Sequence, residues 1–437
     1  MLKYLLFAAV VGFRSVAPTI ACADHSPPAP QSFPVAKFAA AQESSTDDTN
    51  AVNAAIQSAC AAHGGEVVFG NGVTLIEGTI IIPCDGISLV GQGRRTSFVN
   101  CRNGDADCIS FTHAKQIYDT HVRHIDIQGL SKTGGNLINA TGVADMLIED
   151  TIFNHCWNCA LFNNTNNVTL RSVVFNDPHG SYAVKWDAVP PERSDVLSFY
   201  DVVIQGGYHA DGIIWDGFAD TMRMFGITIL HTRIGLHVQN SRRSKSSFPA
   251  FLMATDLEID GASTHAIQID GGIDFHFVNC DISNTSGAPG QGGADGDTVL
   301  INPDEGRSYT RAIYIAGSRI GNSRESAMAV SARDVLVTGT SFHDASKAGR
   351  GAFPVVRIGP GAAGVNITGG IMGVGFGEGV RPSYGLVISA GANRVYISDV
   401  DFYGAVLGDV QNYSNGQVAI LGGLDNAGKL RSVRSSR

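Results

Sequence analysis

The sequence predicts an all-β solenoid of stacked coils, closed at its N-terminal end by a short helix. A strand-like pattern recurs from about residue 147 to residue 403, and the large apolar residue near its end returns every 22 to 38 residues, mostly every 22 to 30. That period is typical of stacked β-coils. Composition agrees: 52 glycines with only 15 prolines and 16% charged residues suit many tight turns between short strands.

Each copy of the pattern reads as a strand that runs into a turn, because apolar and other residues alternate before an Asn, an Asp or another turn-prone residue. One coil cannot bury its apolar face alone, but a stack of ten or more builds a continuous core. The copies lie at residues 147–154, 170–176, 199–205, 225–229, 254–260, 277–283, 315–321, 337–343, 367–373 and 397–403.

The first 23 residues have the features of an export signal. Lys3 precedes an apolar stretch at residues 4–11, and Ala21-Cys22-Ala23 forms a small-x-small cleavage motif. We therefore expect a secreted or periplasmic protein; lipidation of Cys22 is an alternative. The apolar stretch is too short to span a membrane, so no membrane association is expected.

The rest of the chain divides into three parts. Residues 24–44, rich in Pro, Ala and Ser, are expected to be flexible. Residues 45–428 form the solenoid domain, and residues 429–437 form a flexible basic tail. Without Lys3 and Arg14, 31 − 2 = 29 basic residues face 40 acidic ones, a net charge of −11. Nucleic-acid binding requires a basic stripe and is not expected.

Seven cysteines remain after the export segment, and an exported protein can form disulfides. Cys280 lies in a repeat strand and is expected to be buried and unreactive. Cys156 and Cys159 lack a second pair at zinc-ligand spacing, which argues against zinc. Pairs close in sequence are close in a solenoid, so the favoured disulfides are Cys60–Cys84, Cys101–Cys108 and Cys156–Cys159.

A helix is predicted from Asp47, with Asp47 or Asp48 as its cap and His63-Gly64-Gly65 as its stop. Strand-like segments follow at residues 66–69, 74–82 and 87–93. A helix in this position would cover the apolar cross-section and the unpaired strand edge at the open end of the stack.

These opening residues resemble the start of the pectate-lyase-like proteins. The shared motifs are Asp47-Asp-Thr followed by a helix, Gly64-Gly-Glu-Val-Val-Phe, and Ile87-Ser-Leu-Val-Gly-Gln-Gly. The resemblance covers about 60 residues by motif and the remainder by repeat pattern only. It implies a right-handed parallel β-helix and carbohydrate chemistry, usually on a long polymer. The pectate-lyase-like proteins include pectate lyases, polygalacturonases, phage tailspike depolymerases and some epimerases. The polygalacturonase strings Asn-Thr-Asp, Gly-His-Gly and Arg-Ile-Lys are absent, and the pectate lyase calcium site has no good match, so no catalytic residue is carried over.

A second strand pattern lies between the copies of the first, at residues 183–187, 212–216, 235–239, 266–270 and 298–302. Alternation places Trp186 and Trp215 in the core, although a slip of one residue would expose them. Strands about 4.8 Å apart would carry one outward column. We name this predicted set the polar column: Asp187, Asp216, Gln239, Asp270 and Asn302. Lys185, His237 and Gln268 would stand beside it.

The leading functional hypothesis is a secreted depolymerase that hydrolyses glycosidic bonds with paired carboxylates. Asp216 would donate the proton, Asp270 or Asp187 would act as base or nucleophile, and His237 would orient a carboxylate. Adjacent coils would place Asp187 and Asp216 about 5 Å apart, as in retaining glycosidases. Two coils would separate Asp216 and Asp270 by about 10 Å, near the inverting range. Such residues also end strands for structural reasons, since they satisfy turn amides.

A polysaccharide lyase is the second hypothesis. Elimination from a uronate needs a base, here Lys185 or His237, and a cation that neutralises the sugar carboxylate, here Arg233, Arg242 or calcium. A non-catalytic carbohydrate-binding or spike-like solenoid is the third, and epimerase chemistry is a further alternative. In all of these the partner is a polysaccharide or oligosaccharide. The expected substrate-binding residues are Lys185, Arg233, Gln239, Gln268, Arg242 and Asn302.

Residues near the column extend the site. The segment Tyr208-His-Ala-Asp211 could contribute from the loop side. No metal ligand set and no cofactor are predicted, with calcium in the Gly-rich segment 283–297 as an alternative. A solenoid has flat sides, so a monomer and a homotrimer both fit the sequence.

Overall fold

The computed structural model describes residues 30–38, 47–111, 116–189, 191–241, 248–285, 296–302, 310–375, 380–425, 427–429 and 434–436. The predicted export signal, Arg242 and most of the Gly-rich segment 283–297 lie outside these ranges. The chain divides into residues 1–30 and residues 31–437, and all helices and strands given below belong to the second unit.

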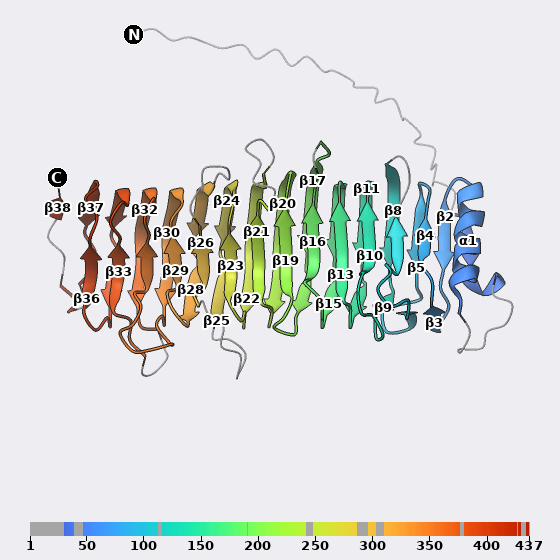
Figure 1. The fold of residues 1–437 in the computed structure, drawn as a ribbon, viewed down its shortest axis with the longest axis horizontal. Coiled ribbons are helices and arrows are strands. Elements are labelled where there is room, and N and C mark those ends of the chain that lie inside the picture. Colours follow the sequence, from blue (N-terminus) through green and yellow to red (C-terminus); the bar gives the residue numbers. More distant parts are fainter. Residues whose placement is uncertain are drawn as a thin grey trace, which may run out of the picture. The chain divides into compact units, whose positions relative to one another are not determined.

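The strands of this unit form two stacked sheets, which we name sheet A and sheet B. In the described residues every pairing between their strands is parallel except that of β37 with β38. Figure 1 shows the coils following one another in chain order from α1 to β37. The fold is therefore a parallel β-helix, as the repeat and the resemblance predict.

Sheet B carries the second strand pattern. Its 13 described strands are β4 (Ile80–Ile82), β7 (Ile109–Phe111), β10 (Asn136–Thr141), β13 (Asn158–Asn163), β16 (Tyr182–Asp187), β19 (Asp211–Asp216), β21 (Ile234–Gln239), β23 (His265–Ile269), β26 (Val299–Ile301), β29 (Met328–Val330), β31 (Val356–Ile358), β33 (Tyr384–Ile388) and β36 (Gly408–Asn412).

Sheet A carries the first pattern. Its described strands are β1 (Ser32–Pro34), β2 (Gly65–Val68), β3 (Gly72–Ile76), β5 (Ile87–Val90), β6 (Ser97–Cys101), β8 (Ile117–Arg123), β9 (Asp126–Gln128), β11 (Val143–Glu149), β12 (Ile152–Asn154), β14 (Asn166–Arg171), β15 (Val174–Asn176), β17 (Ser194–Tyr200), β18 (Val203–Gln205), β20 (Ala219–Leu230), β22 (Ala250–Asp260), β24 (Gly272–Val278), β25 (Asp281–Thr285), β27 (Thr310–Ala316), β28 (Arg319–Ser323), β30 (Arg333–His343), β32 (Ala363–Gly373), β34 (Asn393–Ser398), β35 (Asp401–Tyr403), β37 (Val418–Leu421) and β38 (Arg434–Ser436).

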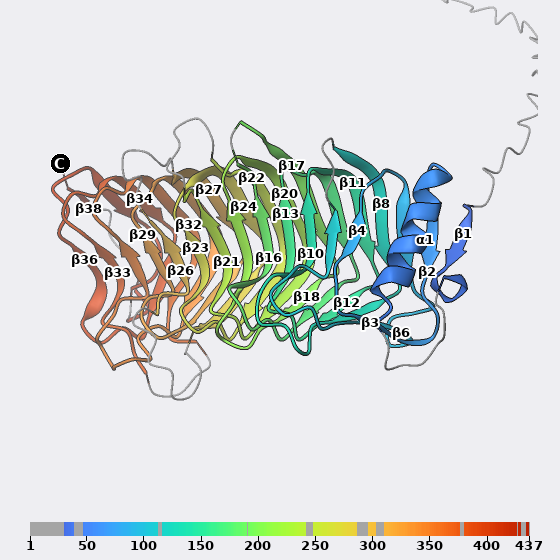
Figure 2. The ribbon, with the colours of Figure 1, turned by 45° about the vertical axis from the view of Figure 1, so that its right-hand side comes forward.

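Helix α1 (Thr49–Ala61) lies at the N-terminal end of the stack (Figures 1 and 2). It buries the apolar face that contains Val52 and Ile56. Asp48 is the N-cap residue, but its carboxylate accepts a hydrogen bond from the Leu75 amide at 3.0 Å. The carboxylate of Asp47 instead accepts the amide of Thr49, also at 3.0 Å. The two acidic residues thus share the tasks of capping the helix and tying it to the first coils.

Two segments outside the predicted solenoid domain contain strands. Within the segment expected to be flexible, β1 pairs in parallel with β2 and is followed by the short 3-10 helix η1 (Val35–Lys37). Phe33 and Val35 are buried, which explains why this part joins the stack. Within the expected tail, β38 pairs antiparallel with β37.

The core confirms the predicted alternation in sheet B. Trp186 and Trp215 occupy paired positions on β16 and β19, are fully buried, and stack with their ring centroids 5.5 Å apart. A slip of one residue would expel both rings from the core, at a cost of roughly 1.5–3 kcal/mol for each large apolar side chain. The register of sheet B, and with it the outward column, is therefore strongly fixed.

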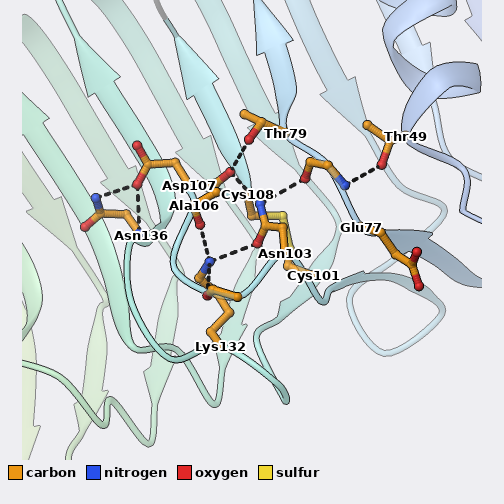
Figure 3. The surroundings of a disulfide bond; sticks show 12 residues. Thr49, Glu77, Thr79, Cys101, Asn103, Ala106, Asp107, Cys108, Lys132 and Asn136 are labelled. Atoms are coloured by element: carbon orange, nitrogen blue, oxygen red, sulfur yellow. Dashed lines mark hydrogen bonds between the residues drawn. A yellow bond between two sulfur atoms is a disulfide. The ribbon is translucent and has the colours of Figure 1, made fainter.

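The three predicted cysteine pairs are at disulfide distance, and Cys280 is free and buried. Figure 3 shows the loop that Cys101–Cys108 closes. The ammonium of Lys132, from the next coil, donates hydrogen bonds to Asn103 Oδ1 at 2.9 Å and to the carbonyl of Ala106. Burial lowers the pKa of Lys132. The hydrogen bonds of Lys132 thus connect this loop to the next coil. Disulfides are typical of proteins from oxidising compartments.

No helix in the described part of the chain combines the length and the apolar character needed to cross a bilayer.

Candidate active site on sheet B

The strand register places the polar column where alternation predicts it. Asp216 pairs with Gln239, and the pairing of Trp186 with Trp215 aligns Asp187 with Asp216. His237 stands beside the column, paired with Gln268 on the following strand. The outward positions of β16 to β26 are thus mostly polar, with Ile214 and Leu300 as the apolar residues in the row of Lys185, His237 and Gln268.

Asp216 is enclosed by its own hydrogen bonds. Its Oδ1 accepts the amides of Gly217 at 2.7 Å and Ser241 at 3.0 Å. Its Oδ2 accepts Gln239 Nε2 at 3.1 Å and Ser241 Oγ at 2.6 Å. The residue is only 2% exposed. A proton donor must reach the glycosidic oxygen, so this geometry does not support the acid role predicted for Asp216.

Asp187 is also buried, and its Oδ2 lies 3.1 Å from Lys185 Nζ. The ammonium that was considered as a base is therefore paired with a carboxylate. Lys185 and Asp187 form an ion pair along one strand, β16, which stabilises the charged form of the ammonium and leaves Asp187 inaccessible to a substrate.

A chain of charged groups links the start of β19 to the end of β23. Asp211 accepts two hydrogen bonds from Arg233, and its Oδ2 lies 3.2 Å from His237 Nδ1. The other ring nitrogen, His237 Nε2, lies 2.9 Å from Asp270 Oδ2. Both imidazole nitrogens therefore donate to carboxylates, which requires the protonated ring.

Electrostatics agree with that protonation. Burial alone would lower the pKa of His237, but hydrogen bonds from its ring to Asp211 and Asp270, and the charges of both, raise it to about 9. Burial would raise the pKa of Asp270, yet the hydrogen bonds of His237 and Asn302 and the charge of His237 hold it below its usual value. At neutral pH this is an imidazolium between two carboxylates, so His237 orients Asp270 and has no free lone pair with which to act as a base.

Asp270 is the most accessible carboxylate of the column, with 30% of its side chain exposed. Gln268 donates to its Oδ2 at 2.7 Å and Asn302 to its Oδ1 at 2.5 Å. Gln239, Gln268 and Asn302 were expected to bind substrate; in the structure each donates to a carboxylate of the column. Arg242, also expected to bind substrate, lies outside the described residues.

Arg233 is the exposed cation in this series of charged groups. Its Nε and Nη2 are fixed on Asp211, while 47% of the side chain faces solvent. A guanidinium carries five N–H donors, so three remain for a ligand. Asp211 is fully buried and holds this cation in one orientation. The sequence did not indicate this anchoring by Asp211, and the substrate-binding role of Arg233 stays a prediction.

A second cluster lies in the turns that lead into sheet B. His155 Nδ1 lies 2.9 Å and His179 Nε2 3.3 Å from the same oxygen, Asp177 Oδ2. His155 follows β12, whereas Asp177 and His179 follow β15 on the next coil. The ligand atoms of all three lie within 4.8 Å of one another, so they could hold a metal ion or act as a His–Asp acid–base pair.

This cluster is continuous with the Arg233 turn. A Cβ at Gly207 would lie 3.5 Å from Asp177 Oδ1, so the turn before β19 touches the cluster. In that turn the amide of Tyr208 donates to the carbonyl of His231 at 2.7 Å, and their rings lie 5.1 Å apart. We name the turns at residues 177–181, 206–210 and 231–233 the turn row. It borders the strand starts of sheet B, beside the charged chain of Arg233, Asp211, His237 and Asp270.

Comparisons with known proteins support the fold. No protein-family model matches the chain, and no curated protein matches it. Among solved structures, the A-module of the Azotobacter vinelandii mannuronan C-5 epimerase AlgE4 is similar, with 18% identity, a TM-score of 0.57 and coverage of 88% of this chain and 99% of that one. Tailspike protein 3 of bacteriophage CBA120 has 13% identity and a TM-score of 0.65, covering 88% of this chain and 60% of that one. DFA-IIIase from Arthrobacter chlorophenolicus A6, in complex with GF2, has 11% identity and a TM-score of 0.54, covering 84% and 94%. At these identities the comparisons establish the fold alone, a parallel β-helix.

Proposed function

We propose that this protein acts on a uronate-containing polysaccharide and removes the proton on the carbon next to the sugar carboxylate. Polysaccharide lyases and uronate epimerases share this step. The observation that carries the proposal is the exposed Arg233 guanidinium, held by two hydrogen bonds on the fully buried Asp211. The proposal places the lyase and epimerase hypotheses ahead of hydrolysis.

Arg233 supplies the positive charge that proton removal requires at the sugar carboxylate. Loss of the proton moves negative charge onto the sugar carboxylate, and a preorganised cation at that carboxylate stabilises the developing charge. A planar guanidinium can bind a carboxylate through two parallel hydrogen bonds. Because Asp211 already fixes Nε and Nη2, the remaining donors point to solvent without a further loss of side-chain freedom.

The base is His179. It is exposed, and its Nε2 faces Asp177, which leaves Nδ1 to take the proton. The carboxylate of Asp177 orients the ring and stabilises the imidazolium that forms. The two bases considered from the sequence are less suitable, since His237 donates from both nitrogens and Lys185 is paired with Asp187.

The outcome of the reaction depends on the second step. After His179 takes the proton, the electron pair can expel the oxygen on the neighbouring carbon, which takes a proton from the His179 imidazolium or from water. This breaks the glycosidic bond and leaves an unsaturated uronate. Alternatively, a water molecule on the opposite face gives a proton to the same carbon and inverts it, and the imidazolium of His179 returns its proton to the solvent. The substrate in either case lies over the turn row and the starts of β16, β19 and β21.

Hydrolysis is the second candidate, and Asp270 favours it. This carboxylate is partly exposed, and its lowered pKa keeps it ionised, as a nucleophile or a base requires. Its difficulty is the acid, because Asp216 is enclosed by four donors and Asp187 is buried on Lys185.

Solvent exchange tests the proposal. The protein is incubated in deuterated water with alginate or with polygalacturonate, and the uronate carbon is followed by nuclear magnetic resonance together with reducing ends and ultraviolet absorbance. Proton abstraction predicts deuterium at that carbon, or an unsaturated product. New reducing ends with neither signal would favour hydrolysis by Asp270, and binding with no turnover would favour the non-catalytic solenoid.

A further inference from the structure

We propose that Arg357 forms a second carboxylate-binding subsite on sheet B, so that the protein binds an acidic polymer across several coils. This inference rests on the proposed function, since it names a further part of the same substrate-binding face. Its chemical class of ligand is the carboxylate of an acidic sugar, several residues along the polymer from the one held by Arg233.

Arg357 resembles Arg233 in one respect, the bonding of an exposed guanidinium to a buried carboxylate, although it makes one hydrogen bond where Arg233 makes two. Arg357 lies on β31 between the buried residues Val356 and Ile358, so it is on the outer face. Its Nη2 donates to Asp297 Oδ2 at 2.8 Å, and 46% of its side chain is exposed. Asp297 is buried, with 3% exposure, and its Oδ1 accepts the amide of Ser326 at 2.9 Å. A buried carboxylate again fixes an exposed guanidinium.

The two anchoring carboxylates occupy equivalent places. The register aligns Asp211 with Ile234, Ile234 with His265, and the position of His265 with that of Asp297. Each lies at or just before the start of a sheet B strand. Three steps of the parallel spacing separate them by about 14 Å along the stack. The two arginines therefore face the same surface, at points separated by a span longer than one sugar residue.

Strand β29, which lies between β26 and β31, leaves room for the contact between Arg357 and Asp297. Ala329 is the outward residue of β29 and pairs with Arg357 on one side and Leu300 on the other. Its small side chain leaves room for the long Arg357 side chain to reach Asp297, two coils back. The backbone around Asp297 is held as well, because His265 Nδ1 donates to its carbonyl at 2.7 Å.

The free donors define the ligand. Arg357 uses one N–H on Asp297, so four remain. Guanidinium donors in fixed positions select planar anionic groups such as carboxylates. A neutral polymer offers no such group, and a short uronate oligomer that occupies only the Arg233 end would not reach Arg357. The inference thus predicts a preference for long acidic chains.

Arg357→Gln is the test, with Arg171→Gln as the control. Arg171 is an exposed arginine that pairs with Glu149 at 3.3 Å on sheet A, away from the proposed surface. Binding is measured by affinity electrophoresis in gels that contain alginate, polygalacturonate or neutral dextran. Deuterium exchange is measured on the same polymers and on uronate trimers. Arg357→Lys, which keeps the charge on Asp297, guards against loss of folding, and thermal melting is recorded for each variant.

Arg357→Gln is expected to weaken binding of the acidic polymers about tenfold, a change of about 1.4 kcal/mol. Turnover of trimers and of saturating polymer should stay at the wild-type level, and Arg171→Gln should bind as wild type. Equal losses in both variants, unchanged binding in Arg357→Gln, or a wild-type protein that binds no acidic polymer would overturn the subsite. Weaker binding of Arg357→Gln, with neither deuterium exchange nor an unsaturated product in the wild type, would retain the subsite and reject the proposed chemistry. Exchange with unchanged Arg357→Gln binding would do the reverse.

Discussion

Arg233 holds Asp211 through two parallel hydrogen bonds, from Nε to Oδ1 at 2.7 Å and from Nη2 to Oδ2 at 2.8 Å. Asp211 is fully buried, and its Oδ2 also contacts His237. The carboxylate of Asp211 therefore holds two groups in place. One is the exposed Arg233 guanidinium, which can bind a ligand, and the other is the His237 imidazolium, which bonds to Asp270. This relationship organises the candidate site and leads to the first prediction.

Replacing Arg233 should remove the group that neutralises the sugar carboxylate. Arg233→Gln is expected to lower kcat/KM on a uronate polymer by about 10²–10³, the effect of losing one preorganised donor to a developing charge. Arg233→Lys keeps the charge but loses the planar guanidinium that can bind a carboxylate through two hydrogen bonds. Its kcat/KM should therefore lie between those of the wild type and Arg233→Gln. Steady-state kinetics measure both, with Arg171→Gln as control. Wild-type kinetics in Arg233→Gln would remove the main support for the proposal.

His179→Gln should strongly slow proton abstraction without destabilising the fold, because the side chain is exposed. A general base contributes about 10²–10⁴ to rate, and deuterium exchange measures the loss. His124→Gln is a matched control, since the side chain of His124 is also exposed and pairs with Asp150 at 3.0 Å. If the His155, Asp177 and His179 cluster worked through a bound metal ion instead, a chelator would stop the wild-type reaction. We expect exchange to persist in its presence.

Asp216→Asn separates hydrolysis from proton abstraction. Asn keeps the shape but presents an amide to the donors Gln239 and Ser241, so we expect a loss of about 1–3 kcal/mol in unfolding free energy. Turnover per folded molecule should stay within a few-fold of wild type. A hydrolase with Asp216 as its acid would instead lose nearly all activity, and denaturant melts with kinetics on the same sample distinguish the two.

The charge on His237 should make stability depend on pH. Its folded pKa of about 9 lies above the ordinary 6.5, so the stabilisation is complete below pH 6.5 and is lost as pH rises through 9. The pKa of Asp270 is lowered, so its contribution to the free energy of unfolding is present above pH 3.8. That contribution is lost as the pH falls through the pKa of Asp270 in the folded protein.

The measurement compares wild type with His237→Gln by denaturant unfolding from pH 4 to pH 10. The advantage of the wild type should reach at most about 3 kcal/mol near pH 5–6, since each pKa unit is worth about 1.36 kcal/mol. It should shrink between pH 7 and pH 10. A constant difference across that range would show that the ring is not charged in the folded protein.

The Cys60–Cys84 disulfide should stabilise the N-terminal end of the stack. It ties the last turn of α1 to the segment after β4 across a separation of 24 residues. Loop-closure entropy for that length gives about 3.5 kcal/mol. The double variant Cys60→Ala, Cys84→Ala should therefore expose α1 to proteolysis and to rapid amide exchange while sheet B keeps its protection. Unchanged protection at residues 49–61 would contradict this.

Local patterns were sufficient for much of the fold. Period and alternation identified the coils, the buried pair Trp186 and Trp215, and the column that contains Asp216 and Asp270. Closeness in sequence was sufficient for the disulfides, because neighbouring coils bring such cysteines together. The strand β1 was missed, since a Pro-rich composition suggested flexibility and the burial of Phe33 depends on the edge of β2.

The site was harder to predict, because it depends on turns. Asp211 has the alternation of the buried residues Ile213 and Trp215, so its pattern gives no sign of contact with an outward histidine. That contact arises at the strand start, where the chain enters sheet B from a turn. His179 is similar: it contacts the same carboxylate as His155 at a turn, where Asp177 has a left-handed backbone conformation with φ 56° after the end of β15. One clue was present, the spacing of 22 residues from Asp211 to Arg233, which is a single coil of the stack.

The most direct test of the account is deuterium incorporation from solvent into a uronate polymer, measured by nuclear magnetic resonance for the wild type and for Arg233→Gln. We predict deuterium at the carbon next to the carboxylate, or an unsaturated uronate at a cleaved end, with a loss of about 10²–10³ in the variant. Polymer that is cut into saturated fragments with no deuterium at that carbon would contradict the account and return Asp270 to the centre of a hydrolytic mechanism.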